Sequence, residues 1–111
     1  MSRPLRVAIN GFGRIGRNVL RAWIENGCYP EFQIVAINDI ADGATLAHLL
    51  RFDSTHGRFA GQVGFDGEAF KLESLGMRQR ILVLQQADPA QLPWQNLQID
   101  VVLECTGHFR S

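Results

Sequence analysis

Two short apolar runs of similar sequence stand on either side of a glycine-rich segment near the start of the chain. They are LRVAIN (Leu5 to Asn10) and FQIVAIN (Phe32 to Asn38). Continuous apolar runs of this length are typical of strands that are buried on both faces of a parallel sheet. Parallel neighbours must be joined by a crossover, which is usually a helix. The pair therefore predicts a strand, helix, strand unit of an α/β protein.

The segment between the two runs predicts the crossover helix. Residues 14–27 carry apolar side chains at helical spacing, and Gly27 is a stop signal. Arg17 and Arg21 are expected on the solvent side of this helix. The apolar face is expected at Ile15, Val19, Ala22 and Trp23.

A second helix and an antiparallel region are expected next. Residues 42–52 begin with a helix cap at Asp42, and their apolar face is formed by Leu46, Leu49 and Leu50. Glycines punctuate residues 52–67, which indicates a loop leading into short antiparallel strands. Residues 69–74 and 78–86 continue the strand character.

The last third of the chain predicts a return to the sheet. A short helix or turn opens at Asp88-Pro89, and Ile99 to Gly107 is expected to form another buried strand. The predicted fold class is therefore α/β, a Rossmann-type, doubly wound, mainly parallel sheet with an antiparallel excursion in its second half. The chain stops directly after a strand, where such a fold would continue with a helix, so we expect a truncated domain.

Length and composition are those of one folded domain, residues 1–111. Apolar residues make up 46% and charged residues 20% of the chain, an ordinary globular balance. Eleven basic and eleven acidic residues cancel, which argues against nucleic acid and membrane surfaces as partners. The amino end has no signal-peptide pattern, and no run is long enough to cross a bilayer, so a cytoplasmic protein is expected.

Three glycines carry the most specific chemical signal. Gly11, Gly13 and Gly16 form G-x-G-x-x-G between the first predicted strand and its helix, and Asp39 ends the next strand. In a dinucleotide site these glycines allow a tight turn, close approach of the pyrophosphate, and close packing of helix and strand. The helix N-terminus then faces the diphosphate. The alternative is a glycine turn beside an unrelated capping aspartate.

Asp39 indicates which dinucleotide the site takes. A carboxylate there accepts hydrogen bonds from the adenosine ribose hydroxyls and repels a 2′-phosphate, and the next residues, Ile40 and Ala41, offer a phosphate no positive charge. NAD is therefore expected rather than NADP. A flavin or methyl-donor site built on the same glycine pattern also tolerates this acid.

Other side chains that could bind a metal or take part in catalysis are expected to have structural roles. Cys28 and Cys105 lack the C-x-x-C spacing of a metal or redox pair, and no metal site is expected. Cys105 and His108 could be a thiolate and its base, but a cysteine that ends a buried strand more often packs. His56 could be a general base, although hydrogen bonding in a loop is the simpler role.

The chain contains the segments VAINGFGRIGRNVLRA, IVAIND, LAHLLRFDSTHGRF and DVVLECTG. Together they closely resemble the amino-terminal half of the glyceraldehyde-3-phosphate dehydrogenase family. The resemblance implies an NAD domain followed by a catalytic domain, and a homotetramer for the intact enzyme. It also implies oxidation of a phosphorylated sugar aldehyde through a cysteine thioester, with hydride transfer to NAD.

The resemblance also implies a set of cofactor-binding residues. Asn10, Gly11, Arg14 and Ile15 would line the diphosphate, Asp39 the adenosine ribose, and the residues after the last strand the adenine and nicotinamide side. The full expected set is Asn10, Gly11, Phe12, Gly13, Arg14, Ile15, Gly16, Asp39, Thr106, Gly107 and Phe109. Many relatives carry an arginine where this chain has Ala87, which affects the adenine contact.

The family's nucleophilic cysteine and partner histidine lie beyond position 111, so no catalytic residue is expected in this chain, which should bind NAD without turnover. Within the family, QADPAQLPWQNLQIDVVLECTG is more similar to the erythrose-4-phosphate dehydrogenase branch, which serves pyridoxine biosynthesis, than to the glycolytic enzyme. The glycolytic phosphorylating enzyme is the alternative. A non-enzymatic NAD-sensing module is the alternative from another class.

Overall fold

The computed structural model describes residues 4–27, 31–53, 57–58, 61–74 and 76–105. Its elements follow the predicted alternation of strands and helices. In chain order they are β1 (Leu5–Asn10), α1 (Arg14–Glu25), β2 (Phe32–Asn38), α2 (Gly43–Arg51), β3 (Phe52–Asp53), β4 (Gly57–Arg58), β5 (Gln62–Phe65), β6 (Ala69–Ser74), β7 (Met77–Leu84), the 3-10 helix η1 (Pro89–Gln91) and β8 (Val101–Glu104).

One six-stranded sheet in the order β5-β6-β7-β2-β1-β8 forms the frame of the domain. The pairs β7-β2, β2-β1 and β1-β8 are parallel, whereas β5-β6 and β6-β7 are antiparallel. A separate two-stranded sheet joins β3 and β4. The predicted α/β, Rossmann-type sheet with an antiparallel excursion is confirmed. β1 neighbours both β2 and β8, so the strand order reverses there, which is where doubly wound sheets bind ligands.

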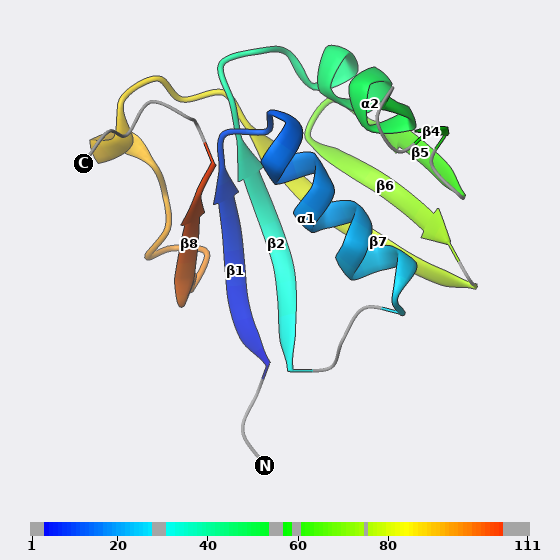
Figure 1. Ribbon diagram of the computed structural model, residues 1–111. Helices are drawn as coiled ribbons and strands as arrows, with labels where there is room; N and C mark the ends of the chain where they lie inside the picture. The colour runs from blue at the N-terminus through cyan, green and yellow to red at the C-terminus, as the bar shows by residue number, and fades with distance from the viewer. Residues whose placement is uncertain (1–3, 28–30, 54–56, 59–60, 75, 106–111) are drawn as a thin grey trace.

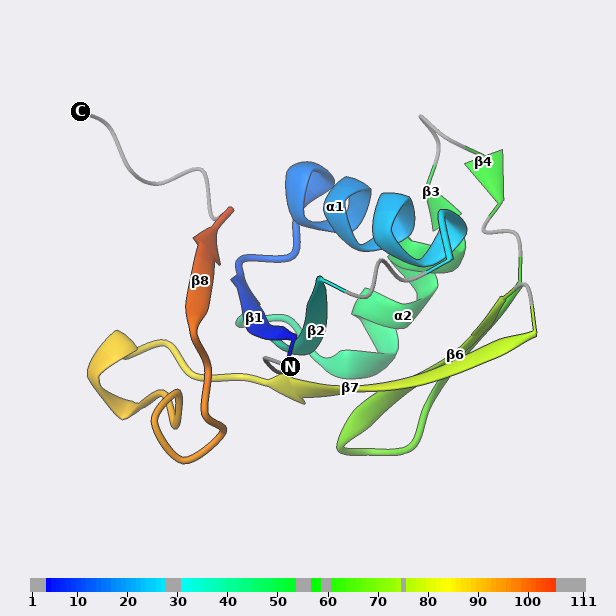
Figure 2. The same ribbon diagram turned by 90° about the horizontal axis from the view of Figure 1, so that it is seen from below.

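Both helices lie on the same face of the sheet (Figures 1 and 2). In Figure 1, α1 lies in front of β7 and to the right of β1 and β2, and α2 lies over the antiparallel end. The connection that contains η1 runs beyond the β8 edge, away from both helices (Figure 2). The carboxyl ends of β1 and β2 point to the same edge as the start of α1 (Figure 1), so this edge carries the candidate site.

The core lies between the sheet and the two helices. Its largest fully buried side chains include Phe12, Leu20, Ile37 and Phe70. The Phe12 and Phe70 rings approach to 5.6 Å between centroids, a distance at which aromatic pairs attract. This contact links the loop after β1 to the antiparallel strand β6, so the glycine-rich turn is anchored to the far side of the core.

The buried face of α1 differs from the one expected. Ile15 is 65% exposed and Ala22 is exposed, whereas Arg21 is only 4% exposed and reaches Glu25 at 3.5 Å. The buried residues are Gly16, Leu20, Arg21, Trp23 and Ile24. The prediction is confirmed for Trp23 and for the partly buried Val19, and it was wrong for Ile15, Ala22 and Arg21 because it ignored Gly16. That glycine packs on β1, and the residues four, seven and eight positions later therefore share its buried face.

The second helix and the last strand also differ in part from expectation. The Asp42 cap is confirmed, because its carboxylate accepts a hydrogen bond from the Thr45 N–H at 2.8 Å, and hydrogen bonds from Thr45 hold the pKa of Asp42 below its usual value. Leu49 is 38% exposed, so it leaves the predicted apolar face. β8 covers only Val101–Glu104, and both of these end residues are exposed because β8 is the edge of the described sheet.

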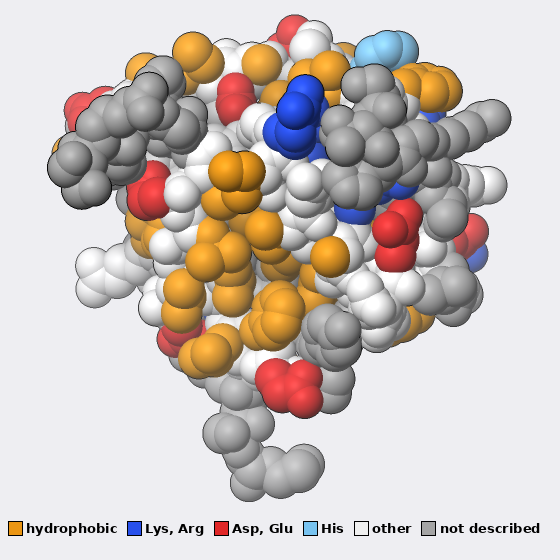
Figure 3. All heavy atoms as spheres, viewed as in Figure 1, with side chains coloured by type: hydrophobic (Ala, Val, Ile, Leu, Met, Phe, Trp, Pro, Cys, Tyr) orange, Lys and Arg blue, Asp and Glu red, His pale blue; other side chains and the backbone are white. Residues whose placement is uncertain are grey.

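Apolar side chains gather on the face that carries α1 (Figure 3). Leu5 is 52% exposed and Val101 38% exposed. The register places Val101 beside Val7, two residues after Leu5 in β1, so these side chains project from one face near the β8 edge. No helix among the described residues is long and apolar enough to cross a membrane.

Ile37, near the carboxyl end of β2, provides a test of the core. Ile37 is fully buried and Ile40 is 76% exposed. Because Ile37→Val removes one buried methylene, it should lower the free energy of unfolding by about 0.5–1.5 kcal/mol. The matched exposed change Ile40→Val should stay within about 0.5 kcal/mol. Urea unfolding followed by circular dichroism measures both, and equal effects of the two changes would contradict this placement of the core.

Candidate dinucleotide-binding site

The predicted glycine motif forms the turn between β1 and α1. Gly11 has φ 94°, a left-handed conformation that favours glycine. Its N–H donates a hydrogen bond to the Asn38 carbonyl at 2.7 Å, which joins the turn to the end of β2. Gly13 is the N-cap of α1, and its carbonyl accepts the Arg17 N–H at 2.9 Å. The strand, turn and helix around the motif are as the sequence predicts.

The motif's last two glycines have different surroundings. A Cβ on Gly16 would lie 2.5 Å from the Gly11 carbonyl oxygen and 3.2 Å from a methyl group of Ile9. A Cβ on Gly13 would meet nothing within 4 Å. Gly16 is therefore required for close packing of α1 on β1, whereas Gly13 borders open space where a ligand can approach the backbone. This is the division of roles that a dinucleotide site requires.

The start of α1 provides hydrogen-bond donors at this open space. The first N–H groups of a helix have no partner within the helix, and α1 has neither a side-chain cap at Gly13 nor an acidic residue in its first turn. The side chains of Arg14 and Ile15 are exposed. The free N–H groups and the positive end of the helix dipole thus favour an anion such as a diphosphate.

Asp39 lies directly beside the glycine turn. Its carboxylate accepts hydrogen bonds from the Phe12 N–H at 2.7 Å and from the Ala41 N–H at 3.0 Å. Its own N–H donates to the Leu84 carbonyl at 3.0 Å. The Phe12 side chain is 1% exposed, so of Phe12 only the backbone borders the turn. Ionised carboxylate oxygens accept more than one hydrogen bond each, so Asp39 retains capacity for ribose hydroxyls.

Polar side chains at the ends of neighbouring parallel strands form a network that the sequence analysis missed, apart from Asn10. The Asn10 amide donates to both oxygens of Glu104 at 2.9 and 3.0 Å. The Asn38 amide donates to Asn10 Oδ1 at 2.8 Å and to the Gln86 carbonyl at 3.0 Å. The Gln86 N–H donates back to Asn38 Oδ1 at 2.9 Å. The repeated ending AIN of β1 and β2 was the available signal.

Several predicted residues lie outside the described part of the chain. They are Thr106, Gly107, Phe109, Cys28, His56 and His108. Cys105 is described, and its thiol is free and half-buried. Its backbone N–H donates a hydrogen bond to the Asn10 carbonyl at 2.7 Å. Burial raises the pKa of the Cys105 thiol, and the Glu104 carboxylate raises it further, which makes it a poor nucleophile. Ala87 is exposed.

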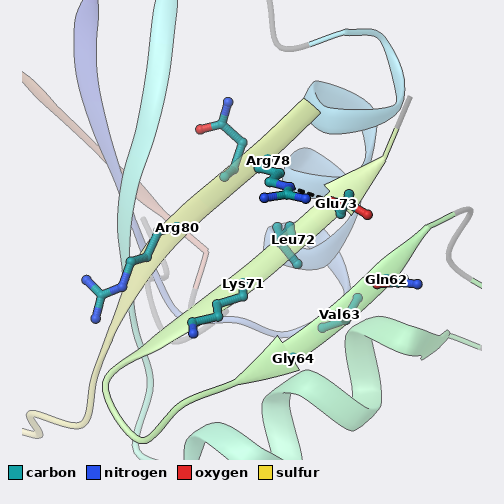
Figure 4. A pocket seen from close by; sticks show the side chains of 9 residues that line it. Gln62, Val63, Gly64, Lys71, Leu72, Glu73, Arg78 and Arg80 are labelled. Carbon is teal, nitrogen blue, oxygen red and sulfur yellow. Dashed lines mark hydrogen bonds and ion pairs between the residues drawn. The ribbon is translucent and has the colours of Figure 1, made fainter. Parts of the chain in front are cut away.

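A hollow of about 540 Å³ lies on the antiparallel strands β5, β6 and β7, and none of its lining residues belongs to the glycine motif (Figure 4). Arg78 turns toward Glu73, with 2.7 Å between Nε and Oε2. Arg80 pairs with Glu68 at 3.1 Å, and Lys71 lies 3.9 Å from Asp66. Because these cations already have acidic partners, the hollow does not offer free charge to an anionic ligand.

The sheet, the glycine turn and the open start of α1 define a dinucleotide-binding α/β domain. The family described as "Glyceraldehyde 3-phosphate dehydrogenase, NAD binding domain" matches residues 5–111. The chain belongs to this family, and NAD is its cofactor.

Curated relatives carry the corresponding name. The chain is 55% identical over 107 residues to the chromosomal glyceraldehyde-3-phosphate dehydrogenase of Cupriavidus necator, and equally to the plasmid enzyme of that organism. It is 51% identical over 107 residues to the glyceraldehyde-3-phosphate dehydrogenase of Pseudomonas aeruginosa. Each match covers 96% of this chain but 31% of the relative. The chain therefore spans less than a third of the length of these relatives.

The two glycines provide a matched test of the turn. Gly16→Ala should lower the free energy of unfolding by about 1–3 kcal/mol, because its Cβ meets a backbone oxygen that cannot move freely. Gly13→Ala should cost about 1 kcal/mol or less, because its Cβ meets nothing within 4 Å and the loss is confined to the weaker N-cap that alanine makes. Thermal and urea unfolding measure both variants. A Gly16 variant as stable as the Gly13 variant would contradict the close packing of α1 on β1.

Proposed function

We propose that this chain is the cofactor-binding part of an NAD-dependent dehydrogenase that oxidises a phosphorylated sugar aldehyde. The observation that carries the proposal is the open space at Gly13, bordered by free N–H groups at the start of α1. The proposal is also supported by the relatives: the sequence is 51–55% identical to enzymes named glyceraldehyde-3-phosphate dehydrogenase.

In this proposal the turn binds the middle of the cofactor. Gly11, Gly13 and the backbone of Arg14 and Ile15 surround the diphosphate, with the Arg14 side chain adding positive charge. Gly16 contributes by keeping α1 close to β1 rather than by contact. The bound NAD supplies the hydride acceptor, and the residues of this chain hold and orient it.

Asp39 selects NAD over NADP. Its carboxylate binds the adenosine ribose hydroxyls, and its negative charge repels a 2′-phosphate. Ile40 is 76% exposed and Ala41 is uncharged, so these neighbours offer such a phosphate no compensation. The fixed hydrogen bonds from Phe12 and Ala41 hold the carboxylate in place before the cofactor binds, which reduces the entropy cost of binding.

The substrate is a phosphorylated sugar aldehyde in this proposal, and two candidates remain. The names of the relatives favour glyceraldehyde 3-phosphate, whereas the resemblance of residues 86–107 favours erythrose 4-phosphate. The catalytic cysteine and histidine of the family lie beyond position 111. The half-buried Cys105, with its raised pKa, does not take that role. Residues 1–111 are therefore proposed to bind the cofactor and not to provide the catalytic cysteine.

The remaining expectations stay predictions. Thr106, Gly107 and Phe109 are proposed to contact the cofactor, and the exposed Ala87 leaves the adenine without the guanidinium of many relatives. Cytoplasmic location, a homotetrameric intact enzyme, and the absence of nucleic-acid and membrane partners belong to the same proposal. A non-enzymatic NAD-sensing role would share the cofactor site, and no described residue favours it.

Calorimetric titration of the chain with NAD and NADP tests the proposal. NAD should bind saturably and NADP at least about tenfold more weakly, a difference of about 1.4 kcal/mol. Asp39→Asn removes the charge while it keeps one oxygen for the turn, and it should bring the two affinities within about threefold. A folded chain that binds neither nucleotide would overturn the proposal.

The control is Asp66→Asn. Asp66 also accepts hydrogen bonds from two backbone N–H groups, those of Glu68 and Ala69 at 2.9 Å each, but it lies in the turn between β5 and β6. Asp66→Asn perturbs a turn to a similar extent as Asp39→Asn does, and it should leave the preference for NAD over NADP unchanged. A loss of preference in both variants would show that a disturbed fold, and not the Asp39 charge, causes it.

A further inference from the structure

Glu104 is a charged residue at the carboxyl edge of the sheet. The proposed function assigns no role to this residue. It ends β8, and the register places it beside Asn10, the last residue of β1. Both carboxylate oxygens accept hydrogen bonds from the Asn10 amide, at 2.9 and 3.0 Å. Asn10 is held in turn by Asn38, which is 4% exposed. The carboxylate therefore has a fixed place at the carboxyl edge of the sheet.

The negative charge of Glu104 has no cationic partner in the part of the chain that the structure describes. Its partner Asn10 is a neutral amide, which satisfies hydrogen bonds but leaves the net charge in place. The same charge acts on the neighbouring Cys105, whose thiol pKa is raised by burial first and by Glu104 in addition. Glu104 therefore acts electrostatically on groups at this edge.

The direction of a bound dinucleotide places one end of the cofactor near Glu104. Asp39 follows β2, and the start of α1 follows β1, so the adenosine half lies on the β2 side and the diphosphate lies after β1. The strand order continues from β2 through β1 to β8. The nicotinamide half must then extend toward the end of β8, which is where Glu104 lies.

We propose that Glu104 makes this site prefer the oxidised cofactor over the reduced one; the inference rests on the proposed NAD site. The nicotinamide ring carries a positive charge in NAD and none in NADH, while the rest of the molecule is the same. A fixed carboxylate on the nicotinamide side attracts only the oxidised ring, and it repels the phosphates of both forms equally. Glu104 therefore changes the ratio of the two affinities.

The test is titration of the wild-type chain and the Glu104→Gln variant with NAD and with NADH. Glutamine keeps one oxygen for the Asn10 amide and removes the charge. The ratio of NAD to NADH affinity should fall about three- to tenfold in the variant, because one exposed charge is lost and the surrounding water weakens its field. The shift should shrink at high salt, because salt screens charges.

The matched control is Glu31→Gln. Glu31 is exposed and directly precedes β2, so it lies at the opposite end of the same parallel strands. The Glu31→Gln substitution changes the net charge by the same amount as Glu104→Gln, and it should leave the ratio of NAD to NADH affinity unchanged. Circular dichroism and thermal unfolding of both variants establish that they are folded.

The outcomes separate this inference from the function on which it rests. If the folded wild-type chain binds neither form, the NAD site itself is overturned, and the role of Glu104 with it. If the wild type binds both forms and Glu104→Gln alters both affinities by the same factor, or neither, the redox preference is overturned and the NAD site stands. An equal ratio shift in Glu31→Gln would also overturn the specific role of Glu104.

Discussion

The contact between Gly16 and the Gly11 carbonyl determines where the rest of the site lies. A side chain at position 16 would come within 2.5 Å of that oxygen, so only glycine lets α1 begin this close to the end of β1. The same contact sets the rotation of α1, which buries Leu20 and Ile24 against the sheet. It also leaves the first turn of the helix open at Gly13, where a diphosphate needs free N–H groups.

The carboxyl edge of the sheet is made rigid by side chains as well as by strand pairing. Asn10 and Asn38 bond to each other and connect the ends of β8, β1, β2 and β7 through Glu104 and the backbone of Gln86. Asp39 then binds the turn through the Phe12 N–H. Asn38, the buried member of this network, bonds through both its amide group and its oxygen, and buried polar groups with such partners hold one geometry. The groups proposed to face the cofactor are thus held in place before it binds, which favours tight binding.

The sequence was sufficient for the parts of the fold that depend on local pattern. The strands ending at Asn10 and Asn38, the start of α1 after the glycines, and the Asp42 cap all follow from periodicity and cap chemistry. The buried face of α1 could not be read from apolar spacing alone, because a tertiary contact of Gly16 rotates the helix. Arg21 is consequently buried and Ile15 exposed.

The candidate site was predictable to a similar extent. The glycine turn and its proximity to Asp39 followed from the motif, whereas the hydrogen bonds that join Asn10 to Asn38 and Glu104 depend on which strands become neighbours. Strand order is a property of the whole chain, so single residues at strand ends give only a weak signal. The exposed end of β8 was missed for the same reason: its position at the sheet edge is set by topology.

A crystal structure of the chain with NAD would show where the cofactor binds and in which direction it lies. The diphosphate should lie at the first-turn N–H groups of α1, above Gly13, with the adenosine ribose at Asp39 and the nicotinamide half on the β8 side. NAD bound elsewhere, for example in the hollow on β5, β6 and β7, would contradict this placement. So would a cofactor bound in the reverse direction, with its nicotinamide end beside Asp39.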